Sequence, residues 1–446
     1  MVSHIVCTAS HNLYYNKTDF KSIFKGSLSI YPYKDTYLSY PFIFLGIEMI
    51  KSDENIQTRF DILDGFRGIL AITIVFQHTC HDLGLGGDYG LISDLGYFFA
   101  VPSFFALSSF LLTNKLYTEF IESNGSFESI KQIIVKYLIR RFLRIYVPFV
   151  IYCTYIKTKF SNLDKYPRYK FSTWYDMVTL KHTGINHLWT IPPEVKFYLL
   201  IPIFSFVAYK LKKYFIIWSS LVCLLFGFIE IFNIYGLECV KIGHPHGENL
   251  ELIFQIFLAG SLVGILFYEI QNCKIKLKFL NKFRFLISYI NPISFIYGLK
   301  LSNAFYRPKI YCYISYGVYW SIYILILLLD VQTCFTEVIN LSIFKKFGKY
   351  SFGVYLLHIQ GFRLVHYLIE EKLIRRLDFM ILFLEIFISF IFGIFFYYFI
   401  ENPLMKCANI LCKKAFNSNN VKIITYVILS VYVALIFFFM LRKYFN

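Results

Sequence analysis

The sequence predicts an all-α protein, a polytopic bundle of about ten or eleven transmembrane helices. Hydrophobic residues make up 57% of the 446 positions and charged residues only 16%, whereas soluble domains carry about 25% charged residues. The apolar residues gather in blocks of roughly 18 to 25 residues, long enough to cross about 30 Å of hydrocarbon as helices. The basic residues behind the net charge of +17 form short clusters between these blocks, as in cytosolic loops beside anionic lipid. We therefore expect a lipid bilayer around the chain and no nucleic acid bound to it.

The expected spans begin after an N-terminal segment, residues 1–58, which we assign to the cytosol. A membrane domain follows at 59–405, and residues 406–446 form a C-terminal extension with one extra span. The count is ten or eleven because Asn291 and Pro292 interrupt one span. In chain order the spans are 66–81, 94–113, 142–158, 188–209, 214–234, 250–270, 285–299, 312–330, 351–370, 378–400 and 421–441.

The loop charges predict the orientation. Loop 82–93 has no Lys or Arg and contains Asp82 and Asp88, so we place it outside the cytosol. Loop 114–141 is basic, as are the loops at 345–349 and 406–414, so we place these in the cytosol together with the N-terminus. Segments 157–181 and 371–376 are also basic and fall on the outer side in this scheme. The sequence indicates an integral, multi-pass protein without indicating which cellular membrane holds it.

The first span, RGILAITIVFQHTCH, contains two ionisable residues on one helical face. His78 lies eleven positions after Arg67, close to three full turns and roughly 16 Å along a helix. Ionisable residues inside a span usually face the bundle interior or water. The pair predicts one wall of a polar passage. In the alternative, Arg67 snorkels to the interface and His78 hydrogen-bonds a neighbouring helix.

A second cluster, NHLWTIPPEVKFYLLIPIF, places His187, Trp189, Glu194 and Lys196 at the mouth of another span. Its Pro-Pro pair interrupts any earlier helix and is tolerated in the first turn of the next one. Glu194 then lies near a helix N-terminus, where the helix dipole favours a negative charge. An interfacial Trp with a capping carboxylate is the alternative interpretation.

Two further stretches add candidates. RRFLRIYVPF carries Arg140, Arg141 and Arg144, and arginine suits bidentate contact with phosphate. A basic lip alone would also satisfy the positive-inside tendency. GKYSFGVYLLH ends with His358 inside a span, where a single histidine is more often structural.

We expect no metal centre from these residues. The ten cysteines form no C-x-x-C pair and show no zinc-like spacing. A di-iron oxidase would need many converging ligands; it would draw on His78 and His81 and on His244 and His246, but the ten histidines are mostly isolated.

Taken in order, these stretches resemble the acyltransferase 3 family, membrane proteins that O-acetylate sugars and related acceptors. The resemblance runs from about 60 to 405. The matching motifs are LDGFRGILAITIVFQH at 63–78, FFALSSFLLT at 104–113, RRFLRIYVP at 140–148, HLWTIPPEVKFYLLIP at 187–202, GKYSFGVYLLH at 348–358 and FIENP at 399–403. The chain departs from the family at Ser109, where glycine is usual and a looser helix contact is expected, and at Lys196, where glutamine is common.

The resemblance implies a membrane O-acyltransferase. It would move an acyl group, expected to be acetyl, from cytosolic acyl-CoA to a hydroxyl of a glycan, a lipid-linked glycan or a small alcohol, with no permanently bound cofactor. A histidine suits the role of general base, so His78 would take the hydroxyl proton and Glu194 would orient it or the acceptor. The substrate-binding candidates are Arg67, Arg140, Arg141, Arg144, His187, Trp189, Lys196 and His358.

Two alternatives from other classes stay open at this point. Buried ionisable residues also mark the path of a transporter or exporter without acyl-transfer chemistry, although the chain shows no internal repeat of the kind common in transporters. An inactive acyltransferase relative that serves as a receptor or scaffold is the other, because of the changes around Glu194.

Overall fold

The computed structural model describes residues 54–83, 95–123, 125–159, 170–185, 187–215, 217–220, 250–272, 286–287, 289–299, 313–329, 333–371, 378–417 and 421–441. The chain divides into two units, Met1–Thr58 and Arg59–Asn446, and the architecture below is that of the second. Most of the predicted cytosolic segment and most of the predicted span at 214–234 lie outside the described residues.

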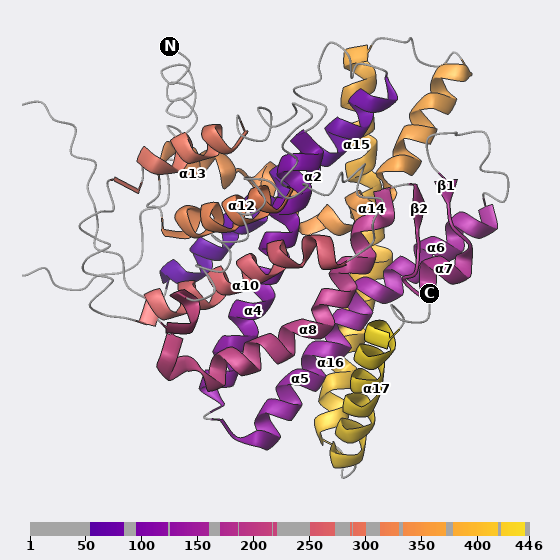
Figure 1. Ribbon diagram of the computed structural model, residues 1–446. Coiled ribbons are helices and arrows are strands. Elements are labelled where there is room, and N and C mark those ends of the chain that lie inside the picture. Colours follow the sequence, from indigo (N-terminus) through magenta and orange to yellow (C-terminus); the bar gives the residue numbers. More distant parts are fainter. Residues whose placement is uncertain are drawn as a thin grey trace, which may run out of the picture. The chain divides into compact units, whose positions relative to one another are not determined.

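The described part of the chain is helical, which confirms the predicted class (Figure 1). Its α-helices are α2 (Glu54–Asp82), α4 (Val101–Glu122), α5 (Phe127–Arg141), α6 (Val147–Lys159), α7 (Trp174–Val178), α8 (Ile191–Lys210), α10 (Leu250–Asn272), α12 (Tyr313–Leu329), α13 (Cys334–Ile339), α14 (Ser342–Glu370), α15 (Asp378–Phe396), α16 (Asn402–Asn417) and α17 (Val421–Leu441).

Short turns of other geometry join these helices. The π-helical turns are η1 (Gly96–Ala100), η2 (Phe142–Tyr146) and η6 (Tyr397–Glu401), and the 3₁₀ turns are η4 (His187–Thr190) and η5 (Lys212–Tyr214). A two-residue antiparallel ladder pairs β1 (Lys170–Phe171) with β2 (Gly184–Ile185). The sequence pattern did not predict this small hairpin.

Several helices can cross a membrane by length and composition. Within the described residues these are His187–Lys210, Ile253–Asn272 and Phe379–Lys414, and Gly317–Leu329 and Thr425–Leu435 are shorter apolar helices. Helix α15 displays large apolar side chains, with Phe379 83% and Phe383 63% exposed. Such a surface suits lipid rather than water. The protein is therefore an integral, multi-pass membrane protein, while the count of ten or eleven spans and the orientation remain predictions.

Helices α4 and α10 pack at very short distance. A Cβ atom on Gly260 would lie 2.2 Å from the Ser109 hydroxyl oxygen, so only glycine fits there. Across the same interface the Thr113 hydroxyl donates to that of Ser261 at 2.8 Å. Small residues and hydrogen bonds are the usual means by which membrane helices associate. Ser109 is fully buried, so the looser contact that we expected there is wrong: the glycine of the pair is on the partner helix.

Helices α2 and α14 touch through their backbones. A Cβ atom on Gly68 would lie 1.9 Å from the carbonyl oxygen of Phe344, and one on Gly348 would lie 1.8 Å from that of Asp64. The contact brings the neighbouring side chains of Arg67 and Lys349 to one place in the bundle.

Candidate functional site

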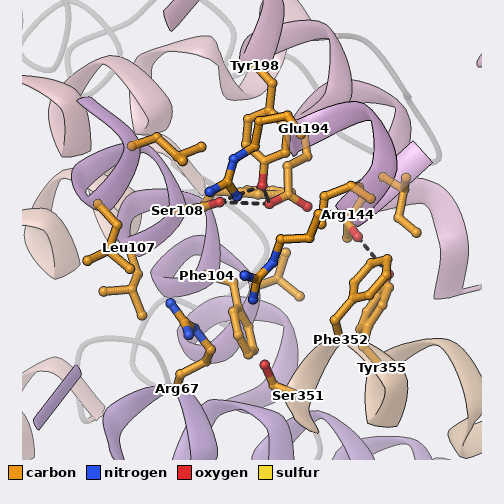
Figure 2. A pocket seen from close by; sticks show the side chains of 18 of the residues that line it. Arg67, Phe104, Leu107, Ser108, Arg144, Glu194, Tyr198, Ser351, Phe352 and Tyr355 are labelled. Atoms are coloured by element: carbon orange, nitrogen blue, oxygen red, sulfur yellow. Dashed lines mark hydrogen bonds between the residues drawn. The ribbon is translucent and has the colours of Figure 1, made fainter. Parts of the chain in front are cut away.

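A cavity of about 280 Å³, here called the inner cavity, lies among α2, α4, η2, α8 and α14 (Figure 2). Its charged lining residues are Arg67, Arg141, Arg144, Lys349 and Glu194. The fold thus brings together four residues that the sequence selected from three separate motifs. Four cations face a single carboxylate in this lining, an arrangement that suits an anionic ligand.

Glu194 is held by two hydroxyl groups. It lies in the first turn of α8, as predicted from the Pro-Pro pair. The Ser108 hydroxyl donates to Glu194 Oε1 at 2.9 Å, and the Tyr198 hydroxyl donates to the same oxygen. The two hydroxyl oxygens are 2.7 Å apart. Sequence reasoning missed both partners, although the four-residue spacing of Glu194 and Tyr198 on one helix was a usable signal.

Acidic partners hold two of the arginines at the cavity edge. Arg67 Nη1 lies 2.9 Å from Asp64 Oδ1, three residues earlier in α2. Arg144 Nη2 lies 3.4 Å from Glu401 Oε1, and Glu401 itself is buried. Each of these ion pairs fixes the direction of a planar guanidinium group, which limits the conformational entropy lost when a ligand binds.

Arg140 and Arg141 diverge. The guanidinium carbon of Arg141 lies 6.0 Å from the centroid of the Tyr198 ring, within cation–π range. Arg140 is not among the residues that line the inner cavity; it lines a separate space of about 30 Å³ beside Lys115 and Glu119. The structure therefore does not bring Arg140 to the place where the other predicted arginines meet.

An outer cavity of about 570 Å³ adjoins the inner one and shares Arg67, Arg144 and Lys349 with it. Lys345 and Lys346 add two further cations to its lining. The sequence indicated 345–349 only as a basic loop. In the structure this segment belongs to the first turns of α14, which is why its lysines point into a common space.

A third, apolar cavity of about 540 Å³ touches the inner one on its other side. Arg141, Ile145 and Tyr198 line both spaces, and Val431 and Leu435 of α17 form part of the far wall. Helix α17 thus borders the region of the candidate site although no motif was found in it.

His78, His187 and His358 form a histidine cluster. The His358 ring centroid lies 5.0 Å from that of His78 and 4.7 Å from that of His187. His358 Nδ1 donates to the Tyr355 carbonyl at 2.8 Å, and His187 Nε2 donates to the Leu356 carbonyl at 3.2 Å. The other ring nitrogens of His187 and His358 are buried and have no hydrogen-bond partner in the described part of the structure. Two imidazole lone pairs therefore lie unused in one cluster.

The histidine cluster lies beside the inner cavity, not in its wall. Along α2 the lining includes Arg67 and Ile74 and stops one turn before His78. Tyr355 connects the two places: it lines the cavity, its hydroxyl donates to the His187 carbonyl, and it contacts the Thr190 hydroxyl at 2.7 Å. The single passage that we expected to hold both Arg67 and His78 is therefore divided by a layer that contains Tyr355.

The remaining candidates lie farther from the charged groups. Trp189 packs edge-on against Phe105, with ring centroids 6.3 Å apart. Lys196 is half-buried and does not line the inner cavity. His244 and His246, which the di-iron alternative would require, lie outside the described residues.

Comparison with protein families shows the class to which this protein belongs. The profile described as an acyltransferase domain, the acyltransferase 3 type, matches residues 60–398. The chain belongs to the acyltransferase 3 family. No curated protein and no solved structure matches it. As an acyltransferase 3 protein it is a membrane O-acyltransferase that uses an acyl donor, which sets aside the transporter without acyl-transfer chemistry. The inner cavity, the outer cavity and the histidine cluster lie almost wholly within the range that the family profile matches.

Proposed function

We propose that this acyltransferase 3 protein transfers an acetyl group from cytosolic acetyl-CoA to an acceptor hydroxyl, on a glycan or another alcohol, across the bilayer. One observation carries the proposal: the two adjoining charged cavities share Arg67, Arg144 and Lys349. A ligand with phosphates at one end and a reactive group at the other fits this arrangement.

The sizes of the cavities support a division of the donor between them. At about 280 Å³ the inner cavity lies at the small end of ligand sites, so it would take the thioester arm. The outer cavity, about 570 Å³ with three lysines, would take the phosphorylated nucleotide. Arg67 and Arg144, at the junction, would contact phosphates bidentately. The basic segment 345–349 is predicted to be cytosolic, which agrees with a cytosolic donor.

The chemistry would take place where the inner cavity meets the histidine cluster. The acceptor oxygen attacks the thioester carbonyl carbon, and His78 receives the hydroxyl proton as general base. The C–S bond then breaks, and the proton passes to the departing CoA thiolate. Arg141 is the cation available to the developing oxyanion. Glu194, with its two hydroxyl partners, orients the acceptor. Tyr355 would have to yield for His78 to reach the reacting atoms.

Transfer from labelled acetyl-CoA by the purified protein in liposomes tests this proposal. We expect release of CoA that depends on an added alcohol acceptor. Arg141→Glu should raise the Michaelis constant for acetyl-CoA by at least tenfold, because it puts a negative charge into the donor site.

Arg140→Glu is the matched control, since it makes the same charge change one residue away and outside the inner cavity. It should leave the Michaelis constant within about twofold of the original. Equal effects of the two substitutions would contradict the inner cavity as the donor site, and wild-type protein without any transfer activity would point to the inactive relative.

A further inference from the structure

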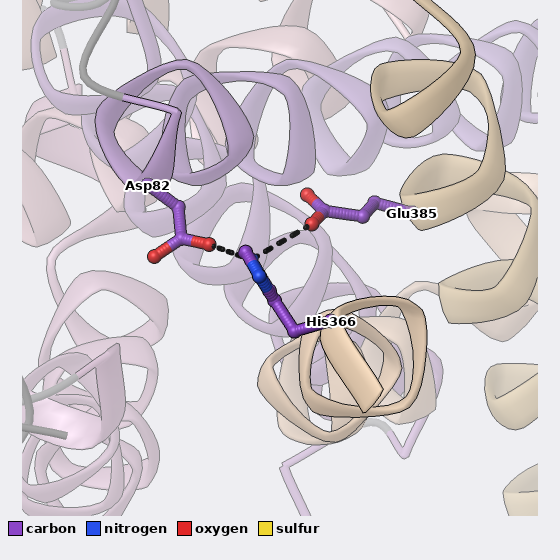
Figure 3. Close-up of side chains that lie close together, drawn as sticks. All are labelled: Asp82, His366 and Glu385. Atoms are coloured by element: carbon purple, nitrogen blue, oxygen red, sulfur yellow. Dashed lines mark hydrogen bonds and ion pairs between the residues drawn. The ribbon is translucent and has the colours of Figure 1, made fainter. Parts of the chain in front are cut away.

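Three potential metal ligands meet where α2, α14 and α15 come together (Figure 3). Asp82 is the last residue of α2, His366 lies near the end of α14, and Glu385 lies within α15. One donor atom from each side chain lies within 4.8 Å of the other two. His366 Nε2 is 2.5 Å from Asp82 Oδ2 and 3.8 Å from Glu385 Oε1. The residues are distant in the chain, so no spacing pattern in the sequence reveals them.

Glu385 is the group that requires an explanation. Its side chain is fully buried, and neither carboxylate oxygen has a hydrogen-bond partner among the described residues. The Thr79 hydroxyl, one turn before Asp82, is a nearby donor to Glu385, but it makes no hydrogen bond of normal geometry with the carboxylate. A buried carboxylate without hydrogen bonds is costly, and the ion-pair partner of Glu385 among the described residues is the His366 imidazole at 3.8 Å.

His366 alone does not neutralise Glu385. An imidazole nitrogen carries a single proton or a single lone pair, and Nε2 of His366 already faces Asp82 at 2.5 Å. The 3.8 Å separation from Glu385 exceeds hydrogen-bond length. Figure 3 shows one oxygen of Glu385 directed at the same nitrogen that Asp82 approaches from the other side. The three groups converge on a point rather than forming a chain.

We propose that Asp82, His366 and Glu385 form a divalent-cation site that takes Zn²⁺. Imidazole and carboxylate are zinc ligands, with bond lengths of about 2.0–2.2 Å. Tetrahedral geometry at these lengths separates two donor atoms by roughly 3.3 Å. The separations of 2.5 and 3.8 Å lie on either side of that value, and all three donor atoms lie within 4.8 Å of one another, so side-chain shifts of about 1–1.5 Å suffice. The ion would replace the Asp82–His366 hydrogen bond and satisfy Glu385.

The site would join the ends of helices that carry the candidate catalytic groups. Helix α2 carries Arg67 and His78, and α14 carries Lys349 and His358. Three protein ligands leave a coordination position for water or for a ligand. In the predicted orientation the site lies at the side away from the cytosol, where an acceptor would arrive.

Zinc binding by the full-length protein in detergent tests the proposal. After removal of metals with a chelator, the protein is titrated with Zn²⁺ alone, and bound zinc is measured by equilibrium dialysis with elemental analysis. The comparison of the wild-type protein with Glu385→Gln shows whether Glu385 is a zinc ligand, because glutamine keeps the shape of the side chain and removes its charge. We expect the variant to bind one zinc fewer per chain, or to bind that zinc at least 100-fold more weakly.

His182→Ala is the control for loss of a histidine. His182 is exposed, bonds to Ser172, and belongs to none of the sites described above. The His182→Ala variant should bind zinc as the wild-type protein does. Zinc should also raise the unfolding temperature of the wild-type protein and of His182→Ala by several degrees, and leave that of Glu385→Gln unchanged.

The proposal is overturned if the wild-type protein binds no zinc, or if Glu385→Gln binds as much zinc as tightly. Should Glu385→Gln not give monodisperse protein, Asp82→Asn decides by the same two measurements, since the Asp82 side chain is only half-buried. Neither readout uses transfer activity, so the result is independent of the proposed reaction.

Discussion

Glu194 accepts hydrogen bonds from two hydroxyl groups in the inner cavity, and these partners define a first prediction. Tyr198→Phe removes one donor to a charged acceptor, a loss of about 1.5–3 kcal/mol, so transfer activity should fall about 10- to 100-fold. Glu194→Gln should cost at least as much. Turnover of labelled acetyl-CoA measures both.

Serine substitutions on α4 supply the control. Ser108→Ala removes the second donor to Glu194 and should lower activity, whereas Ser103→Ala should not. Ser103 is buried on the same helix and does not line the inner cavity. Equal loss in the two serine variants would mean that helix packing, not the bond to Glu194, accounts for the effect.

His78 carries a second prediction at this scale. His78→Ala should abolish transfer while the amount of protein in the membrane and the binding of acetyl-CoA stay unchanged. The cations proposed to bind the donor line the inner and outer cavities, whereas His78 belongs to the histidine cluster. Activity retained within tenfold would remove His78 from the proton-transfer step. In that case Glu194, the carboxylate in the cavity wall, becomes the better candidate for the base.

The motifs were a good guide to the residue types that gather near the inner cavity. They were a poorer guide to which individual side chains face one another. Arg67, Arg141, Arg144 and Glu194 were brought together by the fold at the inner cavity, while their roles there stay predictions. Arg140 was not, since neighbouring residues on a helix point about 100° apart and the π-helical turn η2 begins directly after Arg141. A change in helical pitch of this kind leaves no trace in the residue pattern, so the side of each arginine required the structure.

Among the elements, the contact of α4 with α10 gives a third prediction. Gly260→Leu would push a side chain into the Ser109 hydroxyl and the α4 backbone, so we expect the unfolding temperature to fall by at least several degrees or the protein to be lost from the membrane. Thermal unfolding followed by size-exclusion chromatography measures this.

An exposed site on another helix provides the comparison. Ile203→Leu on α8 changes a side chain that is 46% exposed, and it should leave the unfolding temperature within about one degree. If Gly260→Leu is equally harmless, the close approach of the two helices is not a source of stability.

Long apolar blocks predicted helices well, and amphipathic segments did not. Helices α8, α10, α12, α15 and α17 lie close to their expected ranges, and η2 with α6 covers 142–159, whereas α4 ends nine residues later than expected. Helices α5 and α16 fall in segments taken for basic loops, because their charged residues interrupt the continuous apolar run by which a span is recognised. Apolar residues of α5 still recur at helical spacing, since Ile130 and Tyr137 lie seven residues apart and are both buried. The periodicity of these apolar residues, rather than the length of an unbroken run, was the missing signal.

At the level of the whole molecule, the predicted orientation gives a fourth prediction. Cys407 is exposed in α16, whereas Cys80, Cys153 and Cys412 are buried. In a variant with the other nine cysteines changed to serine, a membrane-impermeant maleimide should label Cys407 only when the reagent has access to the cytosolic face, that is, in permeabilised cells. Sealed and permeabilised cells give the comparison.

If Cys407 is labelled in sealed cells, the predicted orientation is wrong, and the donor would then have to arrive from the other side of the membrane. The charge pattern alone could not decide this, since two basic segments fall on the wrong side of the scheme. The lysines of the outer cavity are the physical reason to expect that this cavity opens to the cytosol. In the proposed reaction the phosphorylated donor is cytosolic, and its phosphates would bind these lysines.

The backbone contact between α2 and α14 limits how the junction between the two charged cavities can widen. With Gly68 and Gly348 pressed against opposing carbonyl oxygens, the two helices cannot move closer together at their crossing, and the Lys345–Asp61 ion pair joins them beside it. A wider junction between the two charged cavities then requires movement of η2, where Arg144 pairs with Glu401. A negatively charged substrate that competes with Glu401 for Arg144 would weaken this ion pair as it binds.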